Sequence, residues 1–199
     1  MIAALSDAAP PLVPGFVESA FSPLVHQAVA RALSRRPVDG SRTAMVLAST
    51  MGDATTLDLG SRLLVSGQVG NALLFMQSTP NAILGVLSRD FSVTGPLLAL
   101  STLDDLAGEL LDAAELLLED DELDTVVLVG VELAGSERTA AAHRELGTEP
   151  ADADLAVALV VDRKDPPPQL TFDDLSLSST RYGGLRGLAE LAARIGANS

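Results

Sequence analysis

The chain has 199 residues, of which 47% are hydrophobic and only 3% aromatic, so it can bury one mainly aliphatic core. Its formal net charge of −14 repels phosphate backbones and anionic lipid, which makes nucleic acids and membrane surfaces poor partner candidates. Cysteine is absent, and the two histidines, His26 and His143, lie far apart in the sequence. We therefore expect no disulfide, no thiolate chemistry and no metal site.

Residues 1–20 are rich in proline and alanine, and we expect them to lie over the surface of the protein. They lack the basic start of a signal peptide and contain Asp7 and several prolines, so they are interpreted neither as a secretion signal nor as a membrane span. A cytoplasmic location is the default expectation. Residues 21–165 are expected to form the main lobe, and residues 166–199 a C-terminal extension that ends in a helix.

Helical and strand patterns alternate along the main lobe, which predicts an α/β fold with helices on both faces of a sheet. Helices are expected at 22–35, from a turn at 51–53 to about 65, at 80–89, 103–119 and 137–146, and strands at 44–48, 97–101, 124–131 and 154–161. Beyond the three prolines at 166–168, one edge strand is expected within 169–177 and an amphipathic helix at 184–195. No phosphate-binding glycine motif is present, so we expect no cofactor.

Three separated segments of the sequence resemble the β-ketoacyl synthases. Residues 46–53 are similar to the strand and glycine turn near the start of that fold, and residues 152–161 to the small-residue strand that closes its N-terminal half. Between them, residues 78–102 resemble a run of a helix, a Gly-Pro turn at Gly95, a strand and the nucleophile elbow. The resemblance covers about residues 20–162. It implies the N-terminal lobe of a thiolase-like fold, with a mixed, mostly parallel sheet flanked by helices.

The departures from this family concern its catalytic groups. Counting from Gly95, the nucleophilic cysteine of an active ketosynthase falls on Asp104. The family's catalytic histidines and lysine belong to a C-terminal half that this sequence does not contain, and His26 and His143 lie outside the catalytic positions. A ketosynthase needs a thiolate to accept the acyl group and imidazoles to stabilise the enolate. The resemblance thus implies a subunit without catalytic residues, not an enzyme.

This pattern resembles the chain length factors, the non-catalytic partners of type II polyketide ketosynthases, and especially the short versions that occur with aryl polyene pathways. The resemblance implies a heterodimer with a catalytic ketosynthase, in which strand 97–101 pairs across a pseudo-two-fold axis through Leu97, Leu98 and Leu100. An apolar strand left as a free edge would aggregate, which favours such a partner. Because the chain is acidic, an acidic acyl carrier protein would be engaged only indirectly, through the ketosynthase. Full-length factors often have Gln where this chain has Asp104.

Phe75, Met76 and Ile83 lie in the region that, in chain length factors, faces the acyl tunnel of the partner. Large side chains there would stop chain growth and small ones would extend it. Packing in the core of the chain itself is the alternative for each of them.

Asp104 has a second interpretation, as an acid in the first turn of a helix that Thr102 caps and whose capping box Asp105 completes. His143 is expected at a solvated helix end and His26 at the surface or in packing. Two other functions stay open from the sequence. One is a weak acyl-thioester enzyme that uses Asp104 as a general base, and the other is a degenerate homodimeric scaffold.

Overall fold

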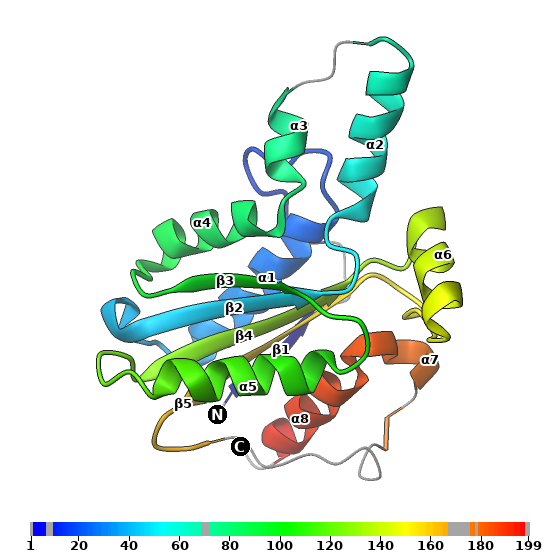
Figure 1. Cartoon of the computed structure of the whole chain (residues 1–199). Helices are drawn as coiled ribbons and strands as arrows, with labels where there is room; N and C mark the ends of the chain where they lie inside the picture. The colour runs from blue at the N-terminus through cyan, green and yellow to red at the C-terminus, as the bar shows by residue number, and fades with distance from the viewer. Residues whose placement is uncertain (1, 7–9, 69–71, 167–175, 178, 198–199) are drawn as a thin grey trace.

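The strands of the described residues form one five-stranded sheet with the order β1-β5-β4-β2-β3 (Figure 1). This computed structural model describes residues 2–6, 10–68, 72–166, 176–177 and 179–197. In chain order the elements are β1 (Ile2–Ser6), α1 (Phe21–Arg35), η1 (Gly40–Arg42), β2 (Thr43–Ser49), α2 (Ala54–Val65), α3 (Ala72–Gln77), α4 (Pro80–Phe91), β3 (Leu97–Ser101), α5 (Leu106–Leu118), β4 (Thr125–Glu132), α6 (Glu137–Leu146), β5 (Leu155–Asp162), α7 (Ser179–Tyr182), η3 (Gly183–Leu185) and α8 (Arg186–Ala197).

The sheet is mixed, as predicted. β3, β2 and β4 are parallel, whereas β5 runs antiparallel to both of its neighbours, β4 and β1. Every residue of β2 and β4 is buried, because helices cover both faces of the sheet and the strand sequences are almost continuously apolar. The strands expected at 44–48, 97–101, 124–131 and 154–161 are all present within one residue of those bounds.

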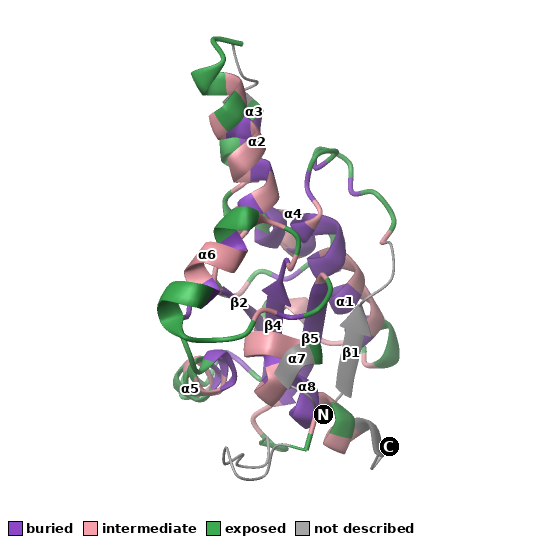
Figure 2. Cartoon of the chain, turned by 90° about the vertical axis from the view of Figure 1, so that its right-hand side faces the viewer, coloured by how far each residue is buried: buried purple, intermediate pink, exposed green. Residues whose placement is uncertain are grey.

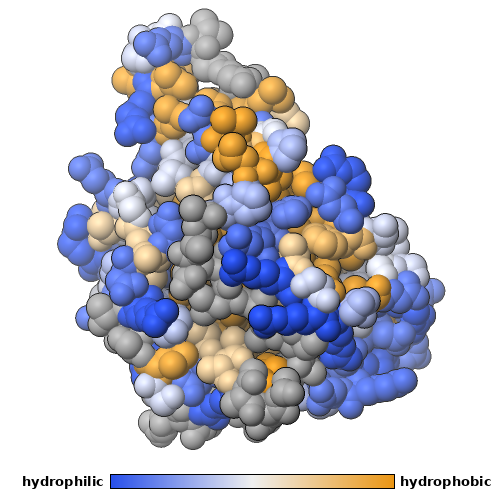
Figure 3. Space-filling model, turned by 180° about the vertical axis from the view of Figure 1, so that it is seen from behind, coloured by the Kyte–Doolittle hydropathy of each residue, from blue (hydrophilic) through white to orange (hydrophobic). Residues whose placement is uncertain are grey.

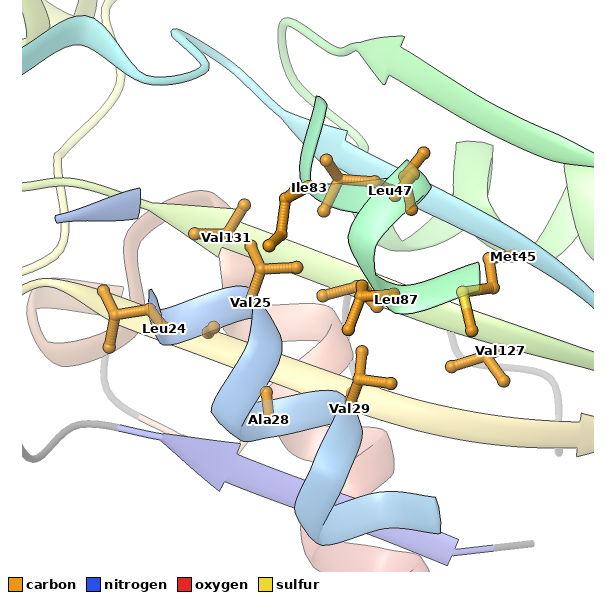
Figure 4. Packing of buried hydrophobic residues seen from close by; sticks show 14 of the residues in the cluster. Leu24, Val25, Ala28, Val29, Met45, Leu47, Ile83, Leu87, Val127 and Val131 are labelled. Carbon is orange, nitrogen blue, oxygen red and sulfur yellow. The ribbon is translucent and has the colours of Figure 1, made fainter. Parts of the chain in front are cut away.

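Two hydrophobic cores lie on opposite faces of the sheet. On one face α1 and α4 pack their apolar sides against β2, β4 and β5, and Figure 4 shows Val25, Val29, Ile83 and Leu87 of this core. On the other face α5 and α8 pack against the opposite sides of the same strands through aliphatic residues such as Leu110 and Leu188. The alternation of strand side chains between faces supplies both cores from one sheet.

The N-terminal segment differs from expectation. Ile2–Ser6 is not draped over the surface but forms β1, which pairs antiparallel with β5 from Ile2 opposite Val160 to Ser6 opposite Ala156. The helix near the C-terminus is confirmed as α8, and it belongs to the second core rather than to a separate extension. The edge strand expected within 169–177 falls almost entirely outside the described residues.

Helices α2 and α3 project from the end of the sheet as a hairpin (Figures 1 and 2). α2 begins where the chain leaves the carboxyl end of β2, after the buried N-cap Asp53, whose side chain accepts from the backbone N–H of Thr56. The outer part of the hairpin is exposed in Figure 2, while the sheet below it is buried. Within the described residues, no helix is long and apolar enough to cross a membrane.

Candidate functional site

Strand β3 forms one border of the sheet. Its register with β2 runs from Met45 opposite Leu97 to Ser49 opposite Ser101, and no other strand of the described residues pairs with its second edge. Leu97 contacts the α1/α4 core and Leu100 the α5/α8 core, while Leu98 remains 38% exposed. An edge of this kind presents unpaired backbone groups to which another chain can add a strand.

The α2–α3 hairpin carries a group of exposed apolar side chains, which we call the hairpin patch: Leu64, Val65, Leu73, Phe75 and Met76. Their exposed fractions range from 45% for Phe75 to 88% for Val65. Figure 3 shows hydrophobic side chains gathered on this projecting part of the molecule. Contiguous apolar patches on a protein surface mark interaction sites more often than isolated apolar residues do.

Ile83 does not belong to this patch. It has no exposed surface and points toward Val25 of α1 and Val131 of β4 (Figure 4). Packing in the chain's own core therefore accounts for Ile83. Of the three residues expected near a tunnel, Phe75 and Met76 are available to a partner and Ile83 is not.

The segment between β3 and α5 corresponds to the nucleophile elbow expected from the sequence. Asp104 is exposed there, and its carboxylate accepts a hydrogen bond of 2.9 Å from the backbone N–H of Asp105. Asp105, not Thr102, is the N-cap of α5, because its side chain accepts from the backbone N–H of Gly108 at 2.9 Å. Thr102 is buried instead, and its hydroxyl has no hydrogen-bond partner within the described part of the chain.

The elbow lacks the groups that thiol-dependent acyl transfer requires. Its side chains provide no thiol, and the N-terminal turn of α5 already donates to the Asp105 carboxylate. Helix N-termini stabilise an oxyanion through free N–H groups and the helix dipole, and two neighbouring aspartates oppose a further negative charge at this point. The structure therefore offers no support for a general-base role of the exposed Asp104.

A polar row with two buried members, Thr102 and Glu132, and the half-buried Thr50 crosses the carboxyl ends of the parallel strands, and the sequence analysis missed it. Extending the registers of β2 with β3 and β4 by one or two residues aligns Thr102, Thr50 and Glu132. Glu132 is only 4% exposed, and burial raises the pKa of its carboxyl group to about 7. The backbone N–H groups of Ala151 and Gly184 and the Thr50 hydroxyl partly offset this rise in pKa, although among the described residues neither carboxyl oxygen has a partner with full hydrogen-bond geometry. The sequence signal that could have identified Glu132 is a single acidic residue at the end of an apolar, β-branched strand.

The two histidines lie on different elements and form no common site. His26 of α1 lies 3.2 Å from a carboxylate oxygen of Asp90 and contacts the Phe91 ring, as a surface packing residue would. His143 contradicts the expectation of a solvated helix end, because it is only 4% exposed and its Nδ1 lies 2.8 Å from the Thr148 hydroxyl. Burial lowers the pKa of His143. Among the described residues, no group of three or more His, Asp or Glu is arranged to hold a metal ion.

No protein-family model and no curated protein matches the chain. Solved structures do. A chain from the complex of the ketosynthase ApeO with its chain length factor ApeC from Xenorhabdus doucetiae matches with a TM-score of 0.60 and 21% identity, over 79% of this chain and 63% of that chain. The ishigamide ketosynthase/chain length factor matches with a TM-score of 0.60 and 15% identity, over 91% and 65%.

A third match is AntDE:AntF, a type II acyl carrier protein in complex with its hexaketide-bound ketosynthase, with a TM-score of 0.59 and 17% identity, over 73% of this chain and 48% of that chain. The predicted thiolase-like fold is thereby confirmed, and its resemblance is to ketosynthase and chain length factor structures. The chain spans 48–65% of the length of these solved chains.

Proposed function

We propose that this chain is a chain-length-factor-like subunit that pairs with a catalytic ketosynthase and shapes its acyl tunnel in cytoplasmic type II polyketide biosynthesis, in particular of polyenes. The open edge of β3 carries the proposal. It is an apolar strand with one bare edge, Leu98 is 38% exposed on it, and the fold is that of proteins solved as ketosynthase–chain length factor complexes. A partner strand would satisfy the backbone groups of this edge.

A non-catalytic role follows from the chemistry of the elbow. Asp104 occupies the position expected for the nucleophile, and the first turn of α5 is capped by Asp105. The partner would therefore supply the thiolate and the imidazoles. An acyl carrier protein would dock on the partner, because the net charge of −14 on this chain repels an acidic carrier.

Phe75 and Met76 are the residues we propose for the tunnel wall. Both lie on α3 within the exposed hairpin patch, so a partner surface or acyl chain can reach them. Replacing Met76 by Ala enlarges any cavity that it bounds, and we expect longer products from the reconstituted pair. The same change at Leu116, which is 68% exposed on α5, is the matched control and should leave the product distribution unchanged.

The deciding experiment is co-expression with a cysteine-bearing type II ketosynthase, followed by size-exclusion chromatography. We expect the two to co-elute, and the chain alone to self-associate through β3. Leu98→Lys places a charge on the strand edge and should abolish co-elution, whereas Leu116→Lys should preserve it. Failure of the unaltered pair to co-elute would remove the heterodimer. A stable homodimer of the chain in the presence of the ketosynthase would favour the scaffold function instead.

The alternative of a weak acyl-thioester enzyme is tested separately. The purified chain alone is incubated with malonyl acyl carrier protein, and thioester loss is measured by mass spectrometry. We expect no turnover above the uncatalysed rate. Turnover that disappears in Asp104→Ala would establish the enzyme instead.

A further inference from the structure

The carboxyl group of Glu132 packs closely against the turn at Gly183 and Gly184, which leads into α8. A Cβ atom on Gly184 would lie 2.4 Å from Oε1 of Glu132, and one on Gly183 would lie 2.8 Å from Oε2. Real Cβ atoms essentially never approach other atoms within 3.0 Å, so a side chain at either position would displace the Glu132 carboxyl group. At Gly183 a Cβ atom would also lie 2.5 Å from the backbone nitrogen of Ala151, so this glycine is required for the turn to close. Gly183 also has a φ of +51°, a conformation that other residues rarely adopt.

The same turn anchors the second core. Leu185 and Leu188 follow it directly and are completely buried. A Cβ atom on Gly130, two residues before Glu132 in β4, would lie 2.6 Å from a methyl carbon of Leu185. The turn and the start of α8 therefore rest on the end of β4 as one closely packed unit. Figure 1 shows α8 beside α5 on this face of the sheet.

The surroundings of Glu132 suit a neutral carboxyl group. It is 4% exposed, and its nearest donors are the uncharged groups of Ala151, Gly184 and Thr50. A carboxylate without a cation or well-formed hydrogen bonds is costly to bury. Burial accordingly raises the pKa of Glu132 to about 7, so a proton leaves it near neutral pH.

Charged groups on the surrounding elements do not compensate Glu132. Arg186, at the start of α8, donates from Nε to the backbone oxygen of Leu177 at 2.7 Å. Asp154, before β5, accepts from the backbone N–H of Ala134. Other ionisable groups on these elements are Asp53 after β2, Asp104 and Asp105 before α5, Glu149 and Asp152 before β5, Arg181 and Tyr182 in α7, and Glu190 and Arg194 in α8. No charge–charge interaction with any of them contributes to the pKa of Glu132.

We propose that Glu132 is a proton-dependent latch, whose neutral carboxyl group lets the Gly183–Gly184 turn and α8 close on the end of β4 and whose ionised form drives that turn open. Opening hydrates the carboxylate and exposes part of the core beneath α8. The latch is independent of the proposed ketosynthase partner, because every group in it belongs to this chain.

Hydrogen–deuterium exchange of peptides covering 179–197 tests the latch in the full chain, with intrinsic rates corrected for pH and α1 as the internal reference. If the carboxyl group has a pKa of 4.5 in the open form and about 7 in the closed form, opening rises by about 30-fold between pH 5.5 and pH 8.5. Glu132→Gln stays neutral and should abolish this rise. Glu190→Gln, a buried acid on α8 itself, is the matched control and should retain it.

A second variant keeps the test decisive if Glu132→Gln fails to fold. Gly183→Ala places a methyl group 2.5 Å from the backbone nitrogen of Ala151 and 2.8 Å from Oε2 of Glu132, so it should hold the turn open and give fast exchange in α8 at both pH values. Equal protection of α8 in the unaltered chain at pH 5.5 and pH 8.5 would overturn the latch. A pH-dependent rise of the same size in Glu132→Gln would overturn it equally.

Discussion

Neutralising Glu132 is expected to stabilise the protein at high pH. The pKa of this carboxyl group is 4.5 in an unfolded chain and about 7 in the fold, because burial disfavours the charged form. The native state therefore binds more protons than the unfolded state between these values, and the free energy of unfolding falls as the pH rises through that window. Above about pH 7 the loss is complete, and well below pH 4.5 it is absent.

The magnitude follows from the two pKa values. At about 1.4 kcal/mol per pKa unit, the full penalty is about 3.4 kcal/mol, of which about 2.5 kcal/mol develops between pH 5 and pH 8. Glu132→Gln removes the ionisation but keeps the shape of the side chain. We expect this variant to match the unaltered chain at pH 5 to within about 1 kcal/mol and to exceed its stability by up to about 2.5 kcal/mol at pH 8.

Urea unfolding followed by far-ultraviolet circular dichroism at pH 5, 6, 7 and 8 measures this difference. The contributions of the other titrating groups to the pH dependence of the free energy of unfolding are the same in both proteins and cancel in the comparison. Burial lowers the pKa of His143, for example, so that group adds stability as the pH rises toward 6.5, but it does so in both proteins. Glu190→Gln should show no gain at pH 8, because backbone and side-chain donors hold the pKa of Glu190 below its usual value despite its desolvation. Parallel stability curves for the unaltered chain and Glu132→Gln would refute a neutral, buried Glu132.

Three further changes test the packing and the elbow. Ile83→Ala should lower the free energy of unfolding by about 3 kcal/mol because of the cavity it leaves, whereas Met76→Ala should change it by less than about 0.5 kcal/mol. Similar losses for both variants in urea titrations would contradict the assignment of Ile83 to the core. Asp105→Ala should cost about 1 kcal/mol as a lost helix cap and Asp104→Ala much less, and the reverse order in thermal unfolding would identify Asp104 as the cap. Gly95→Ala would place a methyl group 2.3 Å from the backbone oxygen of Thr43, so we expect a loss of about 3 kcal/mol or failure to fold, and a variant as stable as the parent would exclude this close approach.

Most helices and central strands could be predicted because their signals are local. Pro80 begins α4, Ser136 caps α6 with its side chain, and Gly147 ends α6 with a φ of +68°. β1 was missed because its signal is not local. Its five residues have no periodicity long enough to identify a strand, and its partners in β5, from Val160 opposite Ile2 to Ala156 opposite Ser6, lie far along the chain.

The site was predicted in part for the same reason. The strand at 97–101 follows from a short stretch of sequence, whereas its place at the border of the sheet was implied only by the family resemblance. The burial of Glu132 does not follow from local sequence, because an acid at the end of an apolar strand normally meets solvent, and the turn that covers it comes from residues 183–184. His143 was placed wrongly by a related error, since a basic residue in the last turn of a helix suits the dipole whether or not that turn is buried.

The capping of α5 bears directly on the proposed non-catalytic role. In a catalytic elbow the N–H groups at the start of the helix must be free to stabilise negative charge on a reacting group. Here one of them donates to Asp105, and Asp104 adds a second negative charge beside it. Restoring a cysteine at position 104 alone would therefore leave the thiolate next to an acidic cap, and we expect Asp104→Cys to stay inactive. Under the proposed function, the contribution of the chain lies at its borders, in the open edge of β3 and the hairpin patch, where shape and contact with another protein are required.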